Sequence, residues 1–200
     1  RKWCTKWQDT IKVGLPGKET EFGLTNTNKM IKTYNGANGI KTGFTQEAGY
    51  CLSASATRGN TTLIAVVLGA KTSKERNAQV AKLLDYGFSA YETAQIFPEG
   101  ETVKKVSVER GEPEQLKAVT GEAAAAFIKK GDKEKVTHKI VIDKDISLPL
   151  KKGDAVGRVD IYYDGQKTGS VRLVSDRDVD KAGFITYYAR SIRSLFEEKQ

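Results

Sequence analysis

The sequence is poor in the residues that bind metals and cross-link small secreted folds. Its 200 residues include a single histidine, His138, and two cysteines, Cys4 and Cys51, with no Cys-x-x-Cys pair. This scarcity argues against a zinc site and a disulfide scaffold, so we expect no metal and no cofactor. One late histidine also excludes a Ser-His-Asp triad in the first half. Nucleophilic chemistry here would therefore need lysine as its base.

The sequence also has no long apolar run, and we do not expect its first residues to be a signal peptide. No stretch reaches the roughly 18 apolar residues that a membrane-spanning helix needs, and the longest apolar run, residues 63–68, has the length of a buried strand. The first residues lack the apolar core and cleavage site of a signal peptide. They begin abruptly, as the start of an excised piece would. With 38% hydrophobic and 29% charged residues, the composition is that of a globular protein.

The formal net charge is +8. Such a charge favours acidic partners, among them nucleic acid, anionic lipid and anionic wall polymers. The basic residues are spread along the chain without interleaved aromatics, which is equally typical of a solvated basic surface. No nucleic-acid-binding motif is present, so we expect no nucleic-acid partner.

An alternating pattern predicts a sheet in the first half. Residues 49–57 alternate between apolar and small polar side chains, and the apolar run 63–68 follows a turn at 58–60. This arrangement predicts an antiparallel hairpin. A strand around Lys41 would add a third member to the sheet.

Helices are expected on both sides of this sheet region in the sequence. Residues 26–33 predict a short helix capped by Asn26 or Thr27, and Trp3 and Trp7 are expected as apolar anchors. A second helix should begin at a Thr72-Ser73-Lys74-Glu75 capping box and pack on the sheet. Its predicted apolar stripe consists of Val80, Leu83, Leu84 and Phe88.

After Phe97 the organisation changes to short strands. A strong hairpin turn is expected at Asp164-Gly165, and the alanines in residues 121–130 indicate a short helical insertion. The predicted strands are 103–108, 136–142, 155–163 and 169–173.

The end of the chain, residues 183–200, is predicted to be helical, amphipathic and basic. A helix of this kind is suited to lying on an anionic membrane surface, or to packing on its own domain or a partner. Both interpretations stay open. Its apolar positions are Phe184, Ile185, Tyr188, Ile192, Leu195 and Phe196.

Residues 39–45, Gly-Ile-Lys-Thr-Gly-Phe-Thr, contain the strongest candidates for a binding or catalytic site. Lys41 offers a cation for a carboxylate, Thr42 offers a hydroxyl for the same group, and Gly43 lets a substrate backbone approach the strand edge. The backbone N–H of Phe44 is a candidate oxyanion donor. Arg76, in the first turn of the second helix, is a candidate second cation for the carboxylate.

A second Lys-Thr-Gly, residues 167–169, follows the Asp164-Gly165 turn. We expect no helix and no second cation near it, so it is interpreted as an exposed strand start. A glycine-flanked turn into a strand also explains part of the first copy.

Several motifs together resemble the low-molecular-weight penicillin-binding proteins, the serine-type D-alanyl-D-alanine carboxypeptidases. The motifs are Asn26-Thr27-Asn28-Lys29, the stretch around Lys41 and residues 48–56, and the likeness continues through 63–69, 83–88 and 146–174. A Lys-Thr-Gly strand is one of three signature elements of penicillin-recognising serine enzymes. The resemblance is specific because separate motifs agree in order and spacing.

The resemblance implies an α/β fold followed by a small all-β domain and a terminal helix. Residues 1–96 would form the C-terminal part of a β-lactamase-like transpeptidase fold, with an antiparallel sheet and a packed helix. Residues 97–182 would form a β-rich stalk domain. Residues 183–200 would be an amphipathic helix that anchors the protein to the membrane.

The resemblance also implies an activity. The family removes the terminal D-alanine from peptidoglycan stem peptides through a serine acyl-enzyme, is acylated by β-lactams, and lies peripherally on the extracytoplasmic face of the bacterial cell membrane. By match to the family pattern, Lys41, Thr42 and Gly43 would form the substrate-binding strand. Phe44 would be the oxyanion donor, and Arg76 a cation near the substrate carboxylate.

One departure from the family pattern concerns the nucleophile. No serine precedes Lys41, since the first is Ser53, and the Ser-x-x-Lys and Ser-x-Asn motifs are missing. We therefore expect the nucleophile in an upstream part, and expect this chain alone to be inactive. That part could be a separate N-terminal chain produced by a nick, a segment of the same polypeptide that this sequence does not include, or a segment lost by truncation, and these alternatives stay open. The alternative is a non-catalytic wall-binding or membrane-tethering module derived from such an enzyme. A β-lactamase is disfavoured by the extra β domain and the basic terminal helix.

Overall fold

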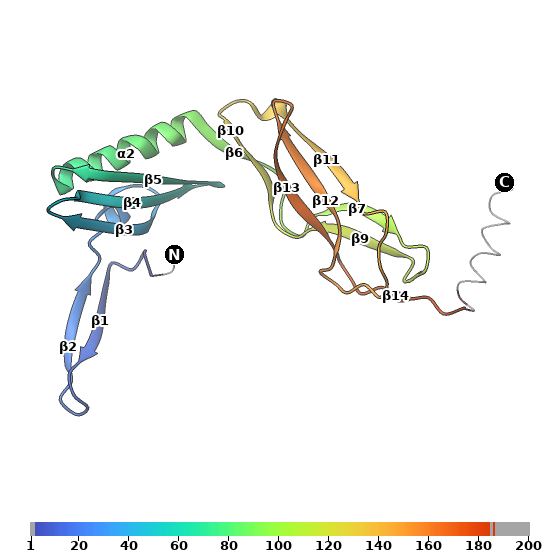
Figure 1. The fold of residues 1–200 in the computed structure, drawn as a ribbon, viewed down its shortest axis with the longest axis horizontal. Helices are drawn as coiled ribbons and strands as arrows, with labels where there is room; N and C mark the ends of the chain where they lie inside the picture. The colour runs from blue at the N-terminus through green and yellow to red at the C-terminus, as the bar shows by residue number, and fades with distance from the viewer. Residues whose placement is uncertain (1–2, 185, 187–200) are drawn as a thin grey trace. The chain divides into compact units, whose positions relative to one another are not determined.

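The computed structural model describes residues 3–184 and 186, and the chain divides into two compact units, residues 1–92 and 93–200 (Figure 1). The first unit ends at Glu92, slightly before the predicted boundary after Ile96. Nearly all of the predicted terminal helix, 183–200, lies outside the described residues. None of the helices among the described residues has the length and hydrophobicity of a membrane-spanning segment.

The first unit contains a three-stranded antiparallel sheet in the order β3-β4-β5, with helix α2 against β4 and β5 (Figure 1). Strands β1 and β2 pair with each other as a separate antiparallel hairpin. The elements are β1 (Gln8–Val13), β2 (Thr20–Thr25), α1 (Met30–Thr33), β3 (Ala37–Thr45), β4 (Gly49–Arg58), β5 (Thr61–Ala70) and α2 (Ser73–Ala90).

The predicted hairpin is confirmed as β4 and β5. Leu52 and Ala54 are buried on the face toward α2, while the intervening Ser53 shares the other face with its partner Val66. Alternation places the apolar side chains on one face because successive residues of a strand point to opposite sides. The core of the unit, which also takes in Met30, therefore lies between the sheet and its helices.

Helix α2 begins where the capping box predicts. The Thr72 hydroxyl accepts the Glu75 N–H at 3.1 Å, and the Glu75 carboxylate reaches back to the Lys71 N–H at 3.1 Å. Val80 and Leu84 are buried against the sheet. Leu83 was wrongly assigned to this stripe, since it is 49% exposed.

Two predictions near the N-terminus are wrong. Helix α1 begins at Met30 instead of near Asn26, because the side chain of Asn26 accepts the Asn28 N–H and holds this segment in a turn. Trp3 is 71% exposed and is no apolar anchor.

The second unit is built of short strands around its own core. A five-stranded antiparallel sheet has the order β11-β12-β13-β9-β7, and β6-β10 and β8-β14 form two smaller pairs. The elements are β6 (Tyr91–Phe97), β7 (Thr102–Ser107), β8 (Gly111–Glu112), β9 (Gln115–Thr120), β10 (Ala124–Lys129), a 3₁₀ turn (Lys133–Lys135), β11 (Val136–Ile142), β12 (Ala155–Tyr163), β13 (Gln166–Ser175) and β14 (Asp180–Lys181).

The four predicted strands of this unit are confirmed as β7, β11, β12 and β13. The Asp164-Gly165 turn is confirmed too, with φ values of 50° and 75° that suit the tight hairpin between β12 and β13. The helical insertion expected at 121–130 is wrong. That segment contains strand β10, in which burial alternates between Ala124, Ala126 and Ile128 on one face and the residues between them.

Candidate functional site

The first Lys-Thr-Gly lies on β3, at the edge of the sheet of the first unit. In the described chain β3 pairs only with β4, through matches that include Lys41 with Ser53 and Gly43 with Cys51. The other side of an edge strand presents backbone N–H and C=O groups that can pair with an added peptide. The strand therefore combines a cation, a hydroxyl and an open edge.

Lys41 and Thr42 belong to opposite faces of this sheet. Lys41 pairs with Ser53 on the face away from α2, whereas Thr42 pairs with the buried Leu52 on the face toward α2, and directly paired residues share a face. The Lys41 side chain is exposed, and its Nζ donates to the Thr42 carbonyl at 2.7 Å. Both groups are thus accessible from the edge of β3, one from each face.

The face that carries Lys41 also carries exposed aliphatic side chains of β5. Ile64, Val66 and Leu68 are 60%, 54% and 74% exposed. Their neighbours Ala65 and Val67 point toward α2 and are buried. In the described part of the chain the β5 part of this face is therefore exposed, whereas Ser55 of β4 on the same face is fully buried. A row of exposed aliphatic side chains is typical of a surface that packs against protein.

Gly43 is not required by the fold. A methyl group added there would lie 3.8 Å from the Cys51 Cβ, an ordinary contact distance, and the backbone of Gly43 is not in the left-handed region. By contrast, a methyl at Gly36 would collide with the Thr57 carbonyl, and Gly36 has φ 81°. The space beside Gly43 is open to a ligand.

Phe44 places its ring on Tyr50, with centroids 4.4 Å apart, and is 57% exposed. The ring contact fixes the strand at this point, directly after Gly43. The oxyanion donor expected at Phe44 is its backbone N–H. The direction of this N–H is set by the backbone of β3, so the side chain can pack on Tyr50 without affecting that role.

Arg76 lies at the start of α2 on the same sheet face as Thr42. It is 5% exposed, and its guanidinium is 6.0 Å from the Tyr50 ring centroid and 3.5 Å from the Cys51 carbonyl, to which Nη1 donates. Burial lowers the pKa of the Arg76 guanidinium. Nε and Nη2 also donate to the Asn77 side chain, so Arg76 is held beside the partner of Gly43.

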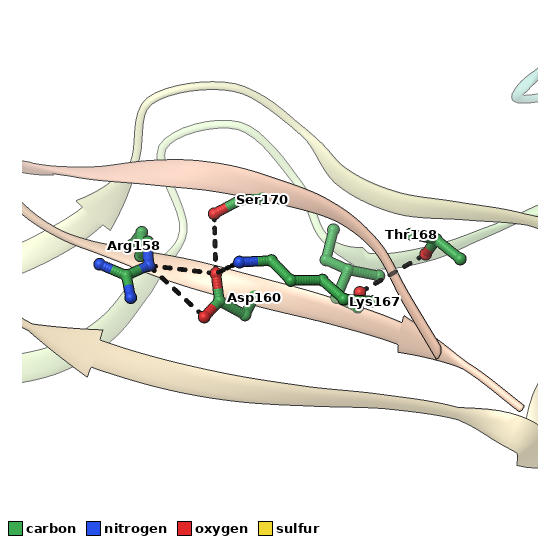
Figure 2. Close-up of polar contacts among 6 residues, drawn as sticks. Arg158, Asp160, Lys167, Thr168 and Ser170 are labelled. Atoms are coloured by element: carbon green, nitrogen blue, oxygen red, sulfur yellow. Dashed lines mark hydrogen bonds and ion pairs between the residues drawn. The ribbon is translucent and has the colours of Figure 1, made fainter. Parts of the chain in front are cut away.

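The second Lys-Thr-Gly sits in a different environment (Figure 2). Lys167 donates to Asp160 at 2.6 Å, and the same carboxylate accepts Arg158 and the Ser170 hydroxyl. Asp160 is 5% exposed, and the hydrogen bond from Lys167, first among several, holds the pKa of its carboxyl below the usual range. The expectation of no second cation near this copy was wrong, since Arg158 shares the carboxylate. The Lys167 side chain, although 46% exposed, is held in an ion pair with Asp160.

The histidine and cysteines take no part in a common site. The His138 ring meets the edge of Phe97, with centroids 5.0 Å apart. Both cysteines are free thiols. Cys4 lies beside Gly39 and Cys51 beside Gly43, at separate points along β3.

Comparisons with known proteins match both units. A family model described as D-alanyl-D-alanine carboxypeptidase matches residues 2–72, and one described as the C-terminal domain of penicillin-binding protein 5 matches residues 91–181. The chain belongs to the low-molecular-weight penicillin-binding proteins. The two matches fall one on each compact unit.

Individual relatives support the same assignment. The D-alanyl-D-alanine carboxypeptidase DacF of Bacillus subtilis is 43% identical over 175 residues, which are 87% of this chain and 45% of the relative. DacC of Escherichia coli is 34% identical over 84% of this chain and 44% of its own length. The crystal structure of penicillin-binding protein 5 from Haemophilus influenzae aligns with a TM-score of 0.67 at 32% identity, covering 89% of this chain and 50% of that one. The chain thus spans about half the length of the relatives it matches.

One residue of the site was given no role by sequence reasoning. The Thr27 hydroxyl lies 2.5 Å from the Thr42 hydroxyl. Thr27 was considered only as a helix cap, within a motif that carried the family resemblance. No local pattern connects it to a strand fifteen residues later, because the contact depends on how the turn folds back onto the edge of β3.

Proposed function

We propose that this chain supplies the substrate-binding strand of a serine-type D-alanyl-D-alanine carboxypeptidase, whose nucleophilic serine and lysine base lie in an upstream part. The observation that carries the proposal is the edge of β3 that the described chain leaves unpaired, with the Lys41 side chain exposed on that strand. The relatives are named for this activity, and this chain matches about half of each.

The substrate would bind along β3 as an added strand. Its terminal carboxylate would accept hydrogen bonds from Lys41 and from the Thr42 hydroxyl at the two faces of the edge, and Gly43 would leave room for its backbone. Arg76, buried behind the partner of Gly43, would add positive charge on the Thr42 side. Desolvation increases the electrostatic effect of such a cation on a nearby anion.

The reaction would proceed by acyl transfer. The serine oxygen of the upstream part attacks the carbonyl carbon of the D-Ala-D-Ala bond, and the Phe44 N–H donates to the developing oxyanion. The C–N bond breaks, the terminal D-alanine leaves with the proton that the lysine base took from the serine, and water hydrolyses the remaining ester. A β-lactam would follow the first half of this path and stay bound as the acyl-enzyme.

We propose that the upstream part packs against the exposed aliphatic face of β5. Ile64, Val66 and Leu68 would be buried by it, and Lys41 on the same face would then lie between the two parts. Burying three such side chains contributes roughly 1.5–3 kcal/mol each. The upstream part could belong to the same polypeptide or to a separate chain that carries Ser-x-x-Lys.

The enzyme would act outside the cytoplasm, on peptidoglycan. We propose that residues 183–200, which lie almost entirely outside the described part of the chain, tether it peripherally to the anionic membrane surface through their apolar positions. The β-rich second unit would then act as a stalk between the tether and the catalytic unit.

The two Lys-Thr-Gly copies provide a matched test of this function. In the complete enzyme, Lys41→Ala should lower the second-order rate of acylation by a β-lactam at least about tenfold, because a charge-assisted hydrogen bond to the substrate carboxylate is lost. Lys167→Ala should leave that rate unchanged, since Lys167 serves an ion pair in the other unit. Unchanged acylation in Lys41→Ala would refute the proposed role of the strand, and with it the binding mode.

A further inference from the structure

The contact between Thr27 and Thr42 links the proposed carboxylate-binding hydroxyl to a residue outside the Lys-Thr-Gly strand. The two hydroxyl oxygens are 2.5 Å apart, and either atom could be the donor. Thr27 is exposed and Thr42 is partly exposed. A hydrogen bond between such groups competes with water and adds little to stability, so its main consequence is for the orientation of the Thr42 hydroxyl.

Thr27 is held in place by the asparagine on each side of it. The Asn26 side chain donates to the Cys4 and Lys6 carbonyls, each at 3.1 Å, and accepts the Asn28 N–H at 2.9 Å, which closes a turn around Thr27. Asn28 is 1% exposed and accepts the Met30 N–H. The hydroxyl of Thr27 is therefore presented to Thr42 from an anchored backbone.

Proton counting fixes the direction of this hydrogen bond in the bound state. A threonine hydroxyl has one proton and two lone pairs, whereas a carboxylate only accepts. When Thr42 donates to the substrate carboxylate, it can meet Thr27 only as an acceptor, so Thr27 must donate. The alternative direction would leave Thr42 without a proton for the substrate.

We propose that Thr27 is a positioning residue, which donates to the Thr42 hydroxyl and so directs the Thr42 proton toward the terminal carboxylate of the substrate. The inference rests on the proposed function, since it needs Thr42 to bind that carboxylate. Thr27 itself touches neither the substrate nor the reacting atoms. Its contribution is selectivity for substrates that end in a free carboxylate.

The test uses the complete enzyme with an acyl-D-Ala-D-Ala peptide and its C-terminal amide. Thr27→Val keeps the shape and removes the hydroxyl. It should raise KM for the acid roughly three- to tenfold, with kcat little changed, because the contact exists in the ground state and the transition state alike. KM for the amide should not change. Thr27→Ser should restore the wild-type value for the acid.

Three further variants separate the possible failures. Thr42→Val should weaken binding of the acid, and Thr27→Val added to it should have no further effect, because the two hydroxyls act in series. Thr25→Val, at an exposed threonine two residues away, serves as the control and should leave KM unchanged.

Three results would overturn the inference. If Thr42→Val leaves the acid unaffected, the proposed carboxylate site itself fails. If Thr42→Val weakens binding but Thr27→Val does not, only the positioning role of Thr27 fails. If Thr27→Val impairs the acid and the amide equally, Thr27 is structural and directs no proton.

Discussion

At the scale of single residues, the two Lys-Thr-Gly copies of this chain lie in different environments. Lys41 projects from an open strand edge, while Lys167 is bound to a carboxylate that is 5% exposed. Likewise, Thr42 meets another hydroxyl, and Thr168 donates to the Ile161 carbonyl inside the hairpin. The motif alone is weak evidence, and the neighbours of each side chain decide which copy is free to bind a ligand.

Alanine substitutions at the glycines of the two copies, Gly43 and Gly169, should distinguish an effect on substrate binding from an effect on stability. Gly43→Ala should leave stability within about 1 kcal/mol of wild type, since the added methyl meets only an ordinary contact, but should cut acylation of the complete enzyme by about tenfold through loss of a substrate hydrogen bond. Gly169→Ala, where a methyl meets nothing within 4 Å, should change neither quantity. Equal acylation in the two variants would contradict strand-edge binding at Gly43.

Asp160 should make the second unit sensitive to acid. Its native pKa is lowered, mainly by Lys167, so its stabilising effect is present above the pKa of the unfolded state, near 4, and is lost as the pH falls through the lower native value. Asp160→Asn should therefore lower the urea midpoint at pH 7, and the deficit should shrink toward pH 3. Asp164→Asn, in the exposed turn, is the control. A deficit independent of pH would exclude the charge as its cause.

At the scale of elements, sequence reasoning succeeded where patterns were local. The hairpin β4–β5 follows from strict alternation, and α2 follows from its cap. It failed at β10, where a run of alanines led to the prediction of a helix. The segment is a strand because alternate side chains pack against the core of the second unit. The candidate strand could be found because its chemistry is contiguous, whereas the partner of Thr42 could not, since it depends on tertiary structure.

The start of α2 offers a direct test of the capping argument. Thr72→Ala removes the acceptor of the Glu75 N–H and should lower the free energy of unfolding of the first unit by about 1 kcal/mol. Thr72→Ser keeps a hydroxyl that can accept this N–H, so it should retain most of the wild-type free energy of unfolding. Urea titration followed by the α2 signal in circular dichroism measures the effect, and a loss shared by Thr72→Ser would point to packing of the methyl group instead.

At the scale of the whole molecule, the two compact units differ in what the described residues leave exposed. The first has an unpaired edge at β3 and exposed aliphatic side chains on β5, and the second is β-rich with a hydrophobic core of its own. This difference is the expected one if the first unit is completed by another part while the second serves as a stalk.

The terminal segment belongs to the same scale. Deleting residues 183–200 should reduce the fraction of protein that sediments with vesicles containing anionic lipid, because the segment combines basic and apolar positions. Binding to neutral vesicles, which is expected to be weak for both proteins, is the control. Undiminished sedimentation of the deletion variant would indicate that the segment packs on protein.

The central claim is that this chain holds the substrate while another part carries the nucleophile. Labelling the complete enzyme with a fluorescent penicillin, followed by digestion and mass spectrometry of the labelled peptide, tests it most directly. We predict a single adduct on a serine of the Ser-x-x-Lys motif outside residues 1–200, and no labelling of this chain by itself. An adduct on any residue of this chain would contradict the account.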